Sequence, residues 1–155
     1  MITIYTDGSC HTQLRRGAYV ALIFIEGVKT IIEDVEDNTT HNRMELMAVI
    51  NAVRYLDKQN VSTDRIDVFT DSQFVAGLPT RYKELQKKNF LTNKGALIQN
   101  ADLIQVFINQ LETHPIHLVK VAAHQKQTGK TNYNREADKL VRSLMRRSID
   151  EKTKT

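Results

Sequence analysis

The stretch ITIYTD at residues 2–7 is a short run of apolar and β-branched residues that ends in an aspartate. Runs of this kind are typical of buried strands. The stretch IDVFTD at residues 66–71 has the same form and the same Thr-Asp ending. A strand with this ending presents its carboxylate at the carboxyl edge of a sheet, where open α/β folds place their binding crevices. The two stretches therefore predict that Asp7 and Asp71 lie at one rim of a sheet.

The period of the apolar residues predicts the remaining strands and helices. In chain order, we expect strands at about 2–7, 18–26 and 29–36, a helix at 43–57, a strand at 66–70, a short helix at 73–78, a basic segment at 80–95, a helix at 101–112, a strand at 117–123 and a last helix that includes residues 137–144. Three strands linked by hairpins, followed by strands that alternate with helices, predict an α/β fold with a mixed sheet covered by helices.

Length and composition predict one domain. The chain has 155 residues, 41% of them hydrophobic, which is enough to bury a core without disulfides. We expect the domain to cover residues 1–148 and a polar tail at 149–155 to be disordered. The lone cysteine excludes an intramolecular disulfide, and no apolar run approaches membrane-spanning length. A cytoplasmic monomer with no membrane association and no obligate protein partner is therefore expected.

The charge balance is compatible with a polyanionic partner. The net charge is +4, from 22 basic and 18 acidic side chains, and the pI is about 9.2. Nucleic acid is one such partner, although many proteins without one share this balance.

Two further carboxylates extend the predicted rim. Glu45 and Asp138 fall in the first turns of two predicted helices, so that four carboxylates could converge. Grouped carboxylates repel one another unless cations neutralise them, and clustered hard oxygen ligands suit Mg²⁺ or Mn²⁺. The ordinary structural interpretations stay open as well. Asn42 and Glu45 have the spacing of a capping box, and the three aspartates could mark a turn, a helix cap and a helix dipole.

Several short motifs follow one another along the chain. They are YTDGSC at 5–10, NRMEL at 42–46, TDSQ at 70–73, His124, and NREADKL at 134–140. This ordered set resembles the type 1 ribonuclease H family, from about residue 1 to about residue 145. The resemblance implies the ribonuclease H-like fold, a mixed five-stranded sheet of three antiparallel strands and two parallel additions with helices on both faces.

The resemblance also implies an activity. It is that of an endonuclease that hydrolyses the RNA strand of RNA/DNA hybrids with two Mg²⁺ ions, or Mn²⁺, and leaves 5′-phosphate and 3′-hydroxyl ends. Asp7 is implied to bridge the two ions, and the ligands that complete the cage are Glu45, Asp71 and Asp138. His124 is implied to assist proton transfer or product release, although AAHQ at 122–125 lacks the flanking glycines usual in the family. A surface histidine is the alternative.

The histidines other than His124 show no ligand spacing, and we expect structural or surface roles for them. They are His11, His41, His114 and His117.

Contacts with the hybrid follow from the same resemblance. Positions that match substrate-contacting residues are Cys10, Asn42 and Gln73, and the position that matches a phosphate-pocket residue is Thr40. Two departures bear on these contacts: His41 stands where asparagine is common, and HTQLRR at 11–16 replaces a turn rich in glycine and proline. Cys10 could equally be an inert packed thiol.

A cationic segment, RYKELQKKNF at 81–90, resembles the basic handle of the family, which grips the hybrid away from the cleavage site. Its candidate contacts are Arg81, Lys83, Lys87 and Lys88. Such patches bind phosphates without sequence preference. Handles usually contain tryptophans and this chain has none, so a differently shaped contact is expected. A solvated helix face is the alternative.

Two other functions stay open from the sequence. One is a nuclease of related fold that acts on DNA or on junctions, and the other is a hybrid-binding domain without catalysis. The complete set of four carboxylates favours catalysis.

Overall fold

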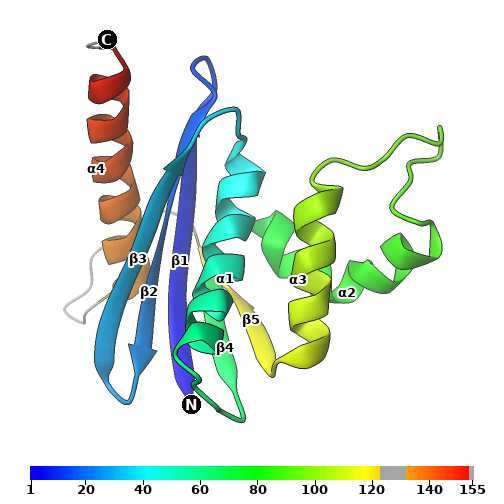
Figure 1. Ribbon diagram of the computed structural model, residues 1–155, viewed down its shortest axis with the longest axis horizontal. Coiled ribbons are helices and arrows are strands. Elements are labelled where there is room, and N and C mark those ends of the chain that lie inside the picture. Colours follow the sequence, from blue (N-terminus) through cyan, green and yellow to red (C-terminus); the bar gives the residue numbers. More distant parts are fainter. Residues whose placement is uncertain (123–131, 154–155) are drawn as a thin grey trace.

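Five strands form one mixed sheet within the residues that the computed structural model describes, 1–122 and 132–153 (Figure 1). They are β1 (Ile2–His11), β2 (Arg16–Ile25), β3 (Val28–Glu36), β4 (Ile66–Thr70) and β5 (Ile116–Lys120). The strands lie in the order β3-β2-β1-β4-β5, with the first three antiparallel and β4 and β5 added in parallel. The predicted fold class is therefore confirmed.

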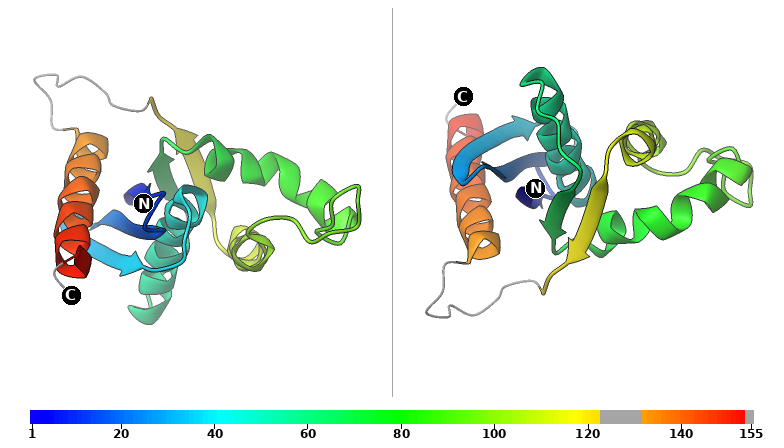
Figure 2. Two further views of the ribbon diagram at one scale, coloured as in Figure 1. Left: turned by 90° about the horizontal axis from the view of Figure 1, so that it is seen from above. Right: turned by 90° about the horizontal axis from the view of Figure 1, so that it is seen from below.

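Helices cover both faces of this sheet. They are α1 (His41–Lys58), α2 (Gln73–Lys87), α3 (Ala101–Thr113) and α4 (Tyr133–Thr153). Figure 2 shows α1 and α3 on one side of the sheet and α4 on the other, while α2 leads away from the end of β4. The two faces bury separate apolar clusters. The larger includes Ile4, Leu46 and Phe107, and the smaller includes Val20 and Val141.

An aromatic group holds the start of α4 against the sheet. Side chains alternate along a strand, so Tyr5 of β1 faces α4. Its ring stacks on Phe69 of β4 with centroids 4.9 Å apart. Tyr133, the first residue of α4, lies 5.2 Å from Tyr5 and 4.5 Å from Phe24, measured between ring centroids. These contacts fix the first turns of α4, which carry Asp138.

β1 is longer than the sequence predicts. It runs on to His11 because it pairs with β2 along its whole length, with Asp7 opposite Val20. The predicted strand end at Asp7 is therefore wrong. β4 pairs with β1 only as far as Tyr5 and ends at Thr70. Asp7 consequently lies just beyond the end of its parallel neighbour, at the sheet edge where a binding crevice is expected.

α2 also extends beyond its predicted end near residue 78. Tyr82 and Leu85 pack against the larger apolar cluster, and this contact favours continuation of the helix to Lys87. Pro79 lies inside the helix and has no N–H, so one internal hydrogen bond of α2 is missing there. The predicted basic segment therefore begins on a helix.

Two other boundaries differ from expectation. β5 stops at Lys120 and not at residue 123, although the Val121 N–H still donates to the Thr70 carbonyl over 2.9 Å. α4 continues to Thr153, within the segment expected to be a disordered tail, because Ile149 still packs against the smaller apolar cluster. None of the helices in the described part of the chain is long and apolar enough to cross a membrane.

Candidate active site

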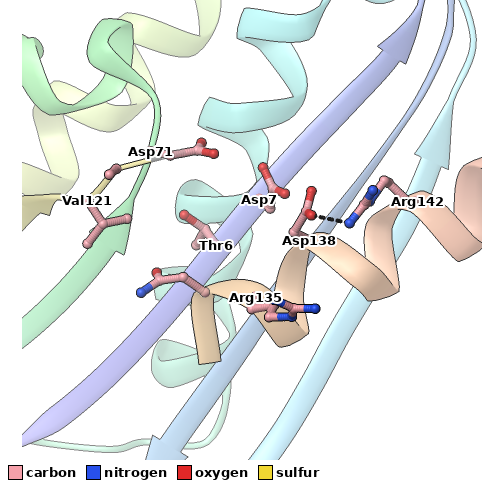
Figure 3. A pocket seen from close by; sticks show the side chains of 9 residues that line it. Thr6, Asp7, Asp71, Val121, Arg135, Asp138 and Arg142 are labelled. Atoms are coloured by element: carbon pink, nitrogen blue, oxygen red, sulfur yellow. Dashed lines mark hydrogen bonds and ion pairs between the residues drawn. The ribbon is translucent and has the colours of Figure 1, made fainter. Parts of the chain in front are cut away.

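The end of β4 brings Asp71 beside Asp7. Ser72 caps α2 by accepting the Val75 N–H over 3.1 Å, and its own N–H donates to the Thr70 hydroxyl over 3.0 Å. Asp71 lies in the middle of this short connection, and Figure 3 shows its carboxylate pointing toward Asp7. Because Ser72 makes the helix cap, the Asp71 carboxylate is not needed for capping.

Glu45 reaches Asp7 through a close approach of two backbones. A Cβ placed on Gly8 would lie 2.6 Å from the Glu45 nitrogen and 2.6 Å from the Met44 carbonyl carbon. Both distances are far below van der Waals contact, so only glycine lets α1 come this near to β1. The contact sets Glu45 next to Asp7, which precedes Gly8 in the strand.

Gly8→Ala is expected to destabilise the fold by ~1–3 kcal/mol, because the added methyl meets backbone atoms that cannot rotate away. Urea unfolding of the metal-free protein measures the change. Gly77→Ala is the matched control, since its Cβ would meet nothing within 4 Å inside α2 and should be neutral or stabilising. Equal effects of the two substitutions would contradict the close contact.

Three carboxylates lie near enough to share one cation. Asp7, Glu45 and Asp71 each offer an oxygen, and these oxygens lie within 4.8 Å of one another. Asp7 is 8% exposed and Glu45 is 1% exposed. Burial, with the charges of the neighbouring carboxylates, raises the pKa of Asp7 to about 9, and burial also raises the pKa of Glu45. Without a compensating cation, the cluster therefore favours holding protons.

The Glu45 carboxylate has a nitrogen donor on one side only. Its Oε1 lies 3.2 Å from Nε2 of His41, one turn earlier in α1, whereas its Oε2 is buried and receives no N–H from the described residues. The other hydrogen bond of this carboxylate is shared with the neighbouring Asp7 carboxyl group, while one of the two holds a proton. A carboxylate oxygen left unpaired in the interior costs free energy. A bound cation would supply the missing partner.

The capping-box interpretation of Asn42 and Glu45 is wrong. The N-cap of α1 is Thr40, whose hydroxyl accepts the Arg43 N–H over 3.3 Å. Glu45 is therefore not engaged with the helix terminus, and its carboxylate is paired with the His41 side chain instead. This hydrogen bond raises the pKa of the His41 imidazole.

Asp138 approaches from α4, on the other face of the sheet from α1. It lines a cavity of about 250 Å³ together with Asp7 and Asp71 (Figure 3). Its Oδ2 accepts a hydrogen bond from Nη2 of Arg142 over 2.6 Å, one turn later on α4. The fourth carboxylate thus lines the same site, but it is already paired with the guanidinium group of Arg142.

A second cavity, of about 430 Å³, shares four lining residues with the first, and these are Asp7, Asp71, Asp138 and Arg142. Polar side chains from the first turns of α1 and α2 also line it, including His41, Asn42 and Gln73, with Glu45 beneath them. Asn42 and Gln73, two of the predicted substrate-binding residues, therefore lie beside the carboxylates. The place of His41 was not predicted from the sequence, although its i,i+4 spacing to Glu45 was an available signal.

The other predicted substrate-binding residues do not line these two cavities. Cys10 is half-buried, with its Sγ 3.5 Å from the Thr39 carbonyl oxygen. The four candidate contacts of the predicted handle are all exposed. Three lie on α2, Arg81, Lys83 and Lys87, and Lys88 is the C-terminal cap of that helix. The predicted handle therefore begins on α2, the helix whose first turn carries Gln73. His124 lies outside the described residues.

The donor set fits a hard divalent cation. All of the candidate ligands are carboxylates, which Mg²⁺ and Mn²⁺ prefer. The raised pKa of Asp7 and the buried Oε2 of Glu45, which receives no N–H from the described residues, both mark a position that lacks positive charge. Asp7, Glu45 and Asp71, with Asp138 beside them, are the residues that would hold such an ion.

Comparison with known proteins gives an independent observation. The family model described as RNase H matches residues 1–146 of the chain. The chain belongs to the ribonuclease H family. It is 30% identical over 147 residues to the Ribonuclease H of Caldicellulosiruptor saccharolyticus, in a match that covers 94% of the chain and 96% of the relative. It is 33% identical over 141 residues to the Ribonuclease HI of Rickettsia prowazekii, in a match that covers 90% of the chain and 88% of the relative.

A solved structure agrees in its fold. It is LC9-RNase H1, described as a type 1 RNase H with the type 2 active-site motif. The TM-score is 0.75 at 24% identity, over 92% of this chain and 70% of the other chain. The family model and the two relatives confirm the predicted family and the predicted enzyme class.

Proposed function

We propose that this chain is an endonuclease that hydrolyses the RNA strand of RNA/DNA hybrids. The observation that carries the proposal is the convergence of Asp7, Glu45 and Asp71 within 4.8 Å in a chain of this family. Asp138 lines the same cavity as two of them. The net charge of +4 suits a polyanionic duplex. The proposed enzyme acts as a cytoplasmic monomer without an obligate protein partner.

The four carboxylates are proposed to hold two Mg²⁺ ions, with Mn²⁺ as a substitute. Ions bound there would supply the positive charge that lowers the pKa of an attacking water and stabilises the departing oxygen, and the products would carry 5′-phosphate and 3′-hydroxyl ends. Asp7 would be the ligand common to both ions, and its pKa, raised by burial and by the charge of each other carboxylate in the group, supports that central place. Arg142 orients the Asp138 carboxylate through its hydrogen bond.

Substrate recognition is proposed to use the first turns of α1 and α2. Asn42 and Gln73 line the cavity beside the carboxylates, and their amides can both donate to and accept from base edges and 2′-hydroxyls. The 2′-hydroxyl is the group that distinguishes RNA from DNA. Thr40, at the N-terminus of α1, is proposed to contact a phosphate, and Cys10 to contact the hybrid beside it.

His124 is proposed to assist proton transfer or product release. His124→Ala is expected to lower kcat by ~10²-fold or less without abolishing cleavage, because the substitution removes a proton carrier and no metal ligand. Steady-state kinetics on a long hybrid measure this effect. Complete loss of activity and an unchanged kcat would each reject the auxiliary role.

The proposed function is tested with the purified chain and four labelled substrates: RNA/DNA hybrid, duplex RNA, duplex DNA and a four-way DNA junction. Each is incubated with Mg²⁺ and with EDTA. Cleavage of the RNA strand of the hybrid alone, in Mg²⁺ alone and with 5′-phosphate ends, is expected. Preferential cleavage of DNA or of the junction would favour the related-fold nuclease. Binding of the hybrid without cleavage would favour a non-catalytic domain.

A further inference from the structure

We propose that His41 is a positioning residue that orients Glu45 for cation binding, an inference that rests on the metal site proposed above. His41 is the first residue of α1, and Glu45 lies one helical turn later. Nε2 of His41 is 3.2 Å from Oε1 of Glu45. Side chains at i and i+4 share one face of a helix, so the helix itself keeps the two groups within reach.

The two oxygens of Glu45 have opposite surroundings. The Glu45 side chain is 1% exposed and the His41 side chain is 62% exposed, so the imidazole covers the carboxylate from the solvent side. Oε1 takes a hydrogen bond from the ring, whereas Oε2 is buried and receives no N–H from the described residues, and the remaining hydrogen bond of Glu45 is shared with the Asp7 carboxyl group. A carboxylate anchored through one oxygen cannot turn freely about its last bond. The anchor therefore leaves the second oxygen for a cation held with Asp7 and Asp71.

A donor of this kind acts through the metal ligand that it holds. Removing a hydrogen-bond partner of a metal ligand typically weakens metal affinity or activity by ~10–100-fold. His41 also lines the larger cavity, where it could instead touch the substrate. The two roles differ in what they change. A positioning role changes the affinity for the metal in the absence of substrate, and a substrate contact changes KM for the hybrid at saturating metal.

The experiment measures Mg²⁺ and Mn²⁺ affinity of the substrate-free protein by isothermal titration calorimetry. His41→Ala is expected to weaken both affinities by about 10-fold or more. His41→Gln is expected to recover most of this affinity, because its amide nitrogen can donate to a carboxylate one turn later. KM for the hybrid at saturating Mg²⁺ should stay near the wild-type value in both variants. His117→Ala, an exposed histidine on β5, controls for the removal of a surface imidazole.

Asp7→Asn separates the failure of this inference from the failure of the metal site. If Asp7→Asn binds metal as the wild type does, the proposed site itself is wrong. If Asp7→Asn binds metal weakly while His41→Ala binds it normally, the site stands and the role of His41 is overturned. Equally weak binding by His41→Ala and His41→Gln, or a raised KM with normal metal affinity, overturns that role as well.

Discussion

Asp7→Asn is expected to slow cleavage by at least ~10³-fold while the protein stays folded and still binds the hybrid. Asparagine keeps the shape of aspartate but lacks the charge that holds a hard cation. Removing several kcal/mol of transition-state stabilisation by the metal corresponds to a factor of this size. Single-turnover cleavage in Mg²⁺ measures it. Asp64→Asn, an exposed aspartate outside the cluster, is the matched control and should cleave normally. Near-normal turnover by Asp7→Asn would remove the carboxylate cluster as the explanation of catalysis.

The same variant is expected to be more stable than the wild type when no metal is present. Burial and the neighbouring carboxylates raise the pKa of Asp7 to about 9, well above the value near ~4 of an aspartate in an unfolded chain. Between these values the folded protein binds more protons than the unfolded chain, so wild-type stability falls as the pH rises through this window. Asparagine does not titrate. Asp7→Asn should therefore increase the free energy of unfolding by ~1–3 kcal/mol at pH 7.

Urea unfolding in EDTA at several pH values measures both the increase and the flatter pH dependence of the variant. If Asp7→Asn were less stable than the wild type at pH 7, or if its stability had the same pH dependence, burial would not raise the pKa of Asp7 as argued.

Replacing the handle lysines Lys83, Lys87 and Lys88 together by alanine is expected to raise KM for a long hybrid by ~10-fold or more, with kcat nearly unchanged. The reason is that contacts remote from the cleavage site stabilise substrate and transition state alike. The three side chains are exposed, and the pair between Lys88 and Glu84 at 3.8 Å is a surface pair of little energetic weight. They are therefore available to phosphates. The salt slope of log K should also become shallower by ~0.9 for each phosphate that the variant no longer binds, if the hybrid behaves as B-form duplex.

Two controls separate the handle from general electrostatics. For a hybrid too short to reach α2 from the carboxylates, the lysine substitutions should change neither KM nor the salt slope. Arg54→Ala with Lys58→Ala removes basic charge at the end of α1 that is remote from the site, and it should leave KM almost unchanged. If long and short hybrids respond alike, or if the salt slope does not move, the segment is only a solvated helix face.

The ends of β1 and β4 show what the sequence could and could not predict about the site. The Thr-Asp ending places Asp71 correctly, because β4 does stop at Thr70. The same ending misplaces the end of β1, because a strand continues for as long as it has a partner, and β2 accompanies β1 to His11. Pairing partners lie far apart in the chain and leave no mark on the local pattern. Asp7 was nevertheless correctly expected at the rim, because β4 is the shorter of the two parallel strands and the sheet edge lies where β4 ends.

The first turn of α1 shows a second limit. Local spacing correctly predicts a helix there, but it suggests a capping box with Asn42, whereas Thr40 makes the cap. The direction of each side chain depends on the residue at which the helix begins. With Asn42 as the cap, Glu45 would face the helix terminus, whereas with Thr40 as the cap its side chain is buried. His41 was not recognised as a partner of Glu45 for a related reason: the i,i+4 spacing is visible in the sequence, but the burial of Glu45 is not. Its partner is buried only because α1 lies against β1, which the sequence around residue 41 does not encode.

The close approach at Gly8 has a consequence for how such a chain can change. The separation of Asp7 and Glu45 is set by main chain against main chain, and main-chain atoms stay the same when a side chain elsewhere is replaced. Buried residues along α1, such as Val49 and Ile50, can therefore be exchanged for others of similar volume while the carboxylates keep their spacing. Sequence drift in the core is therefore compatible with a constant spacing of the two carboxylates, and the tolerance ends at Gly8, which has no side chain to vary.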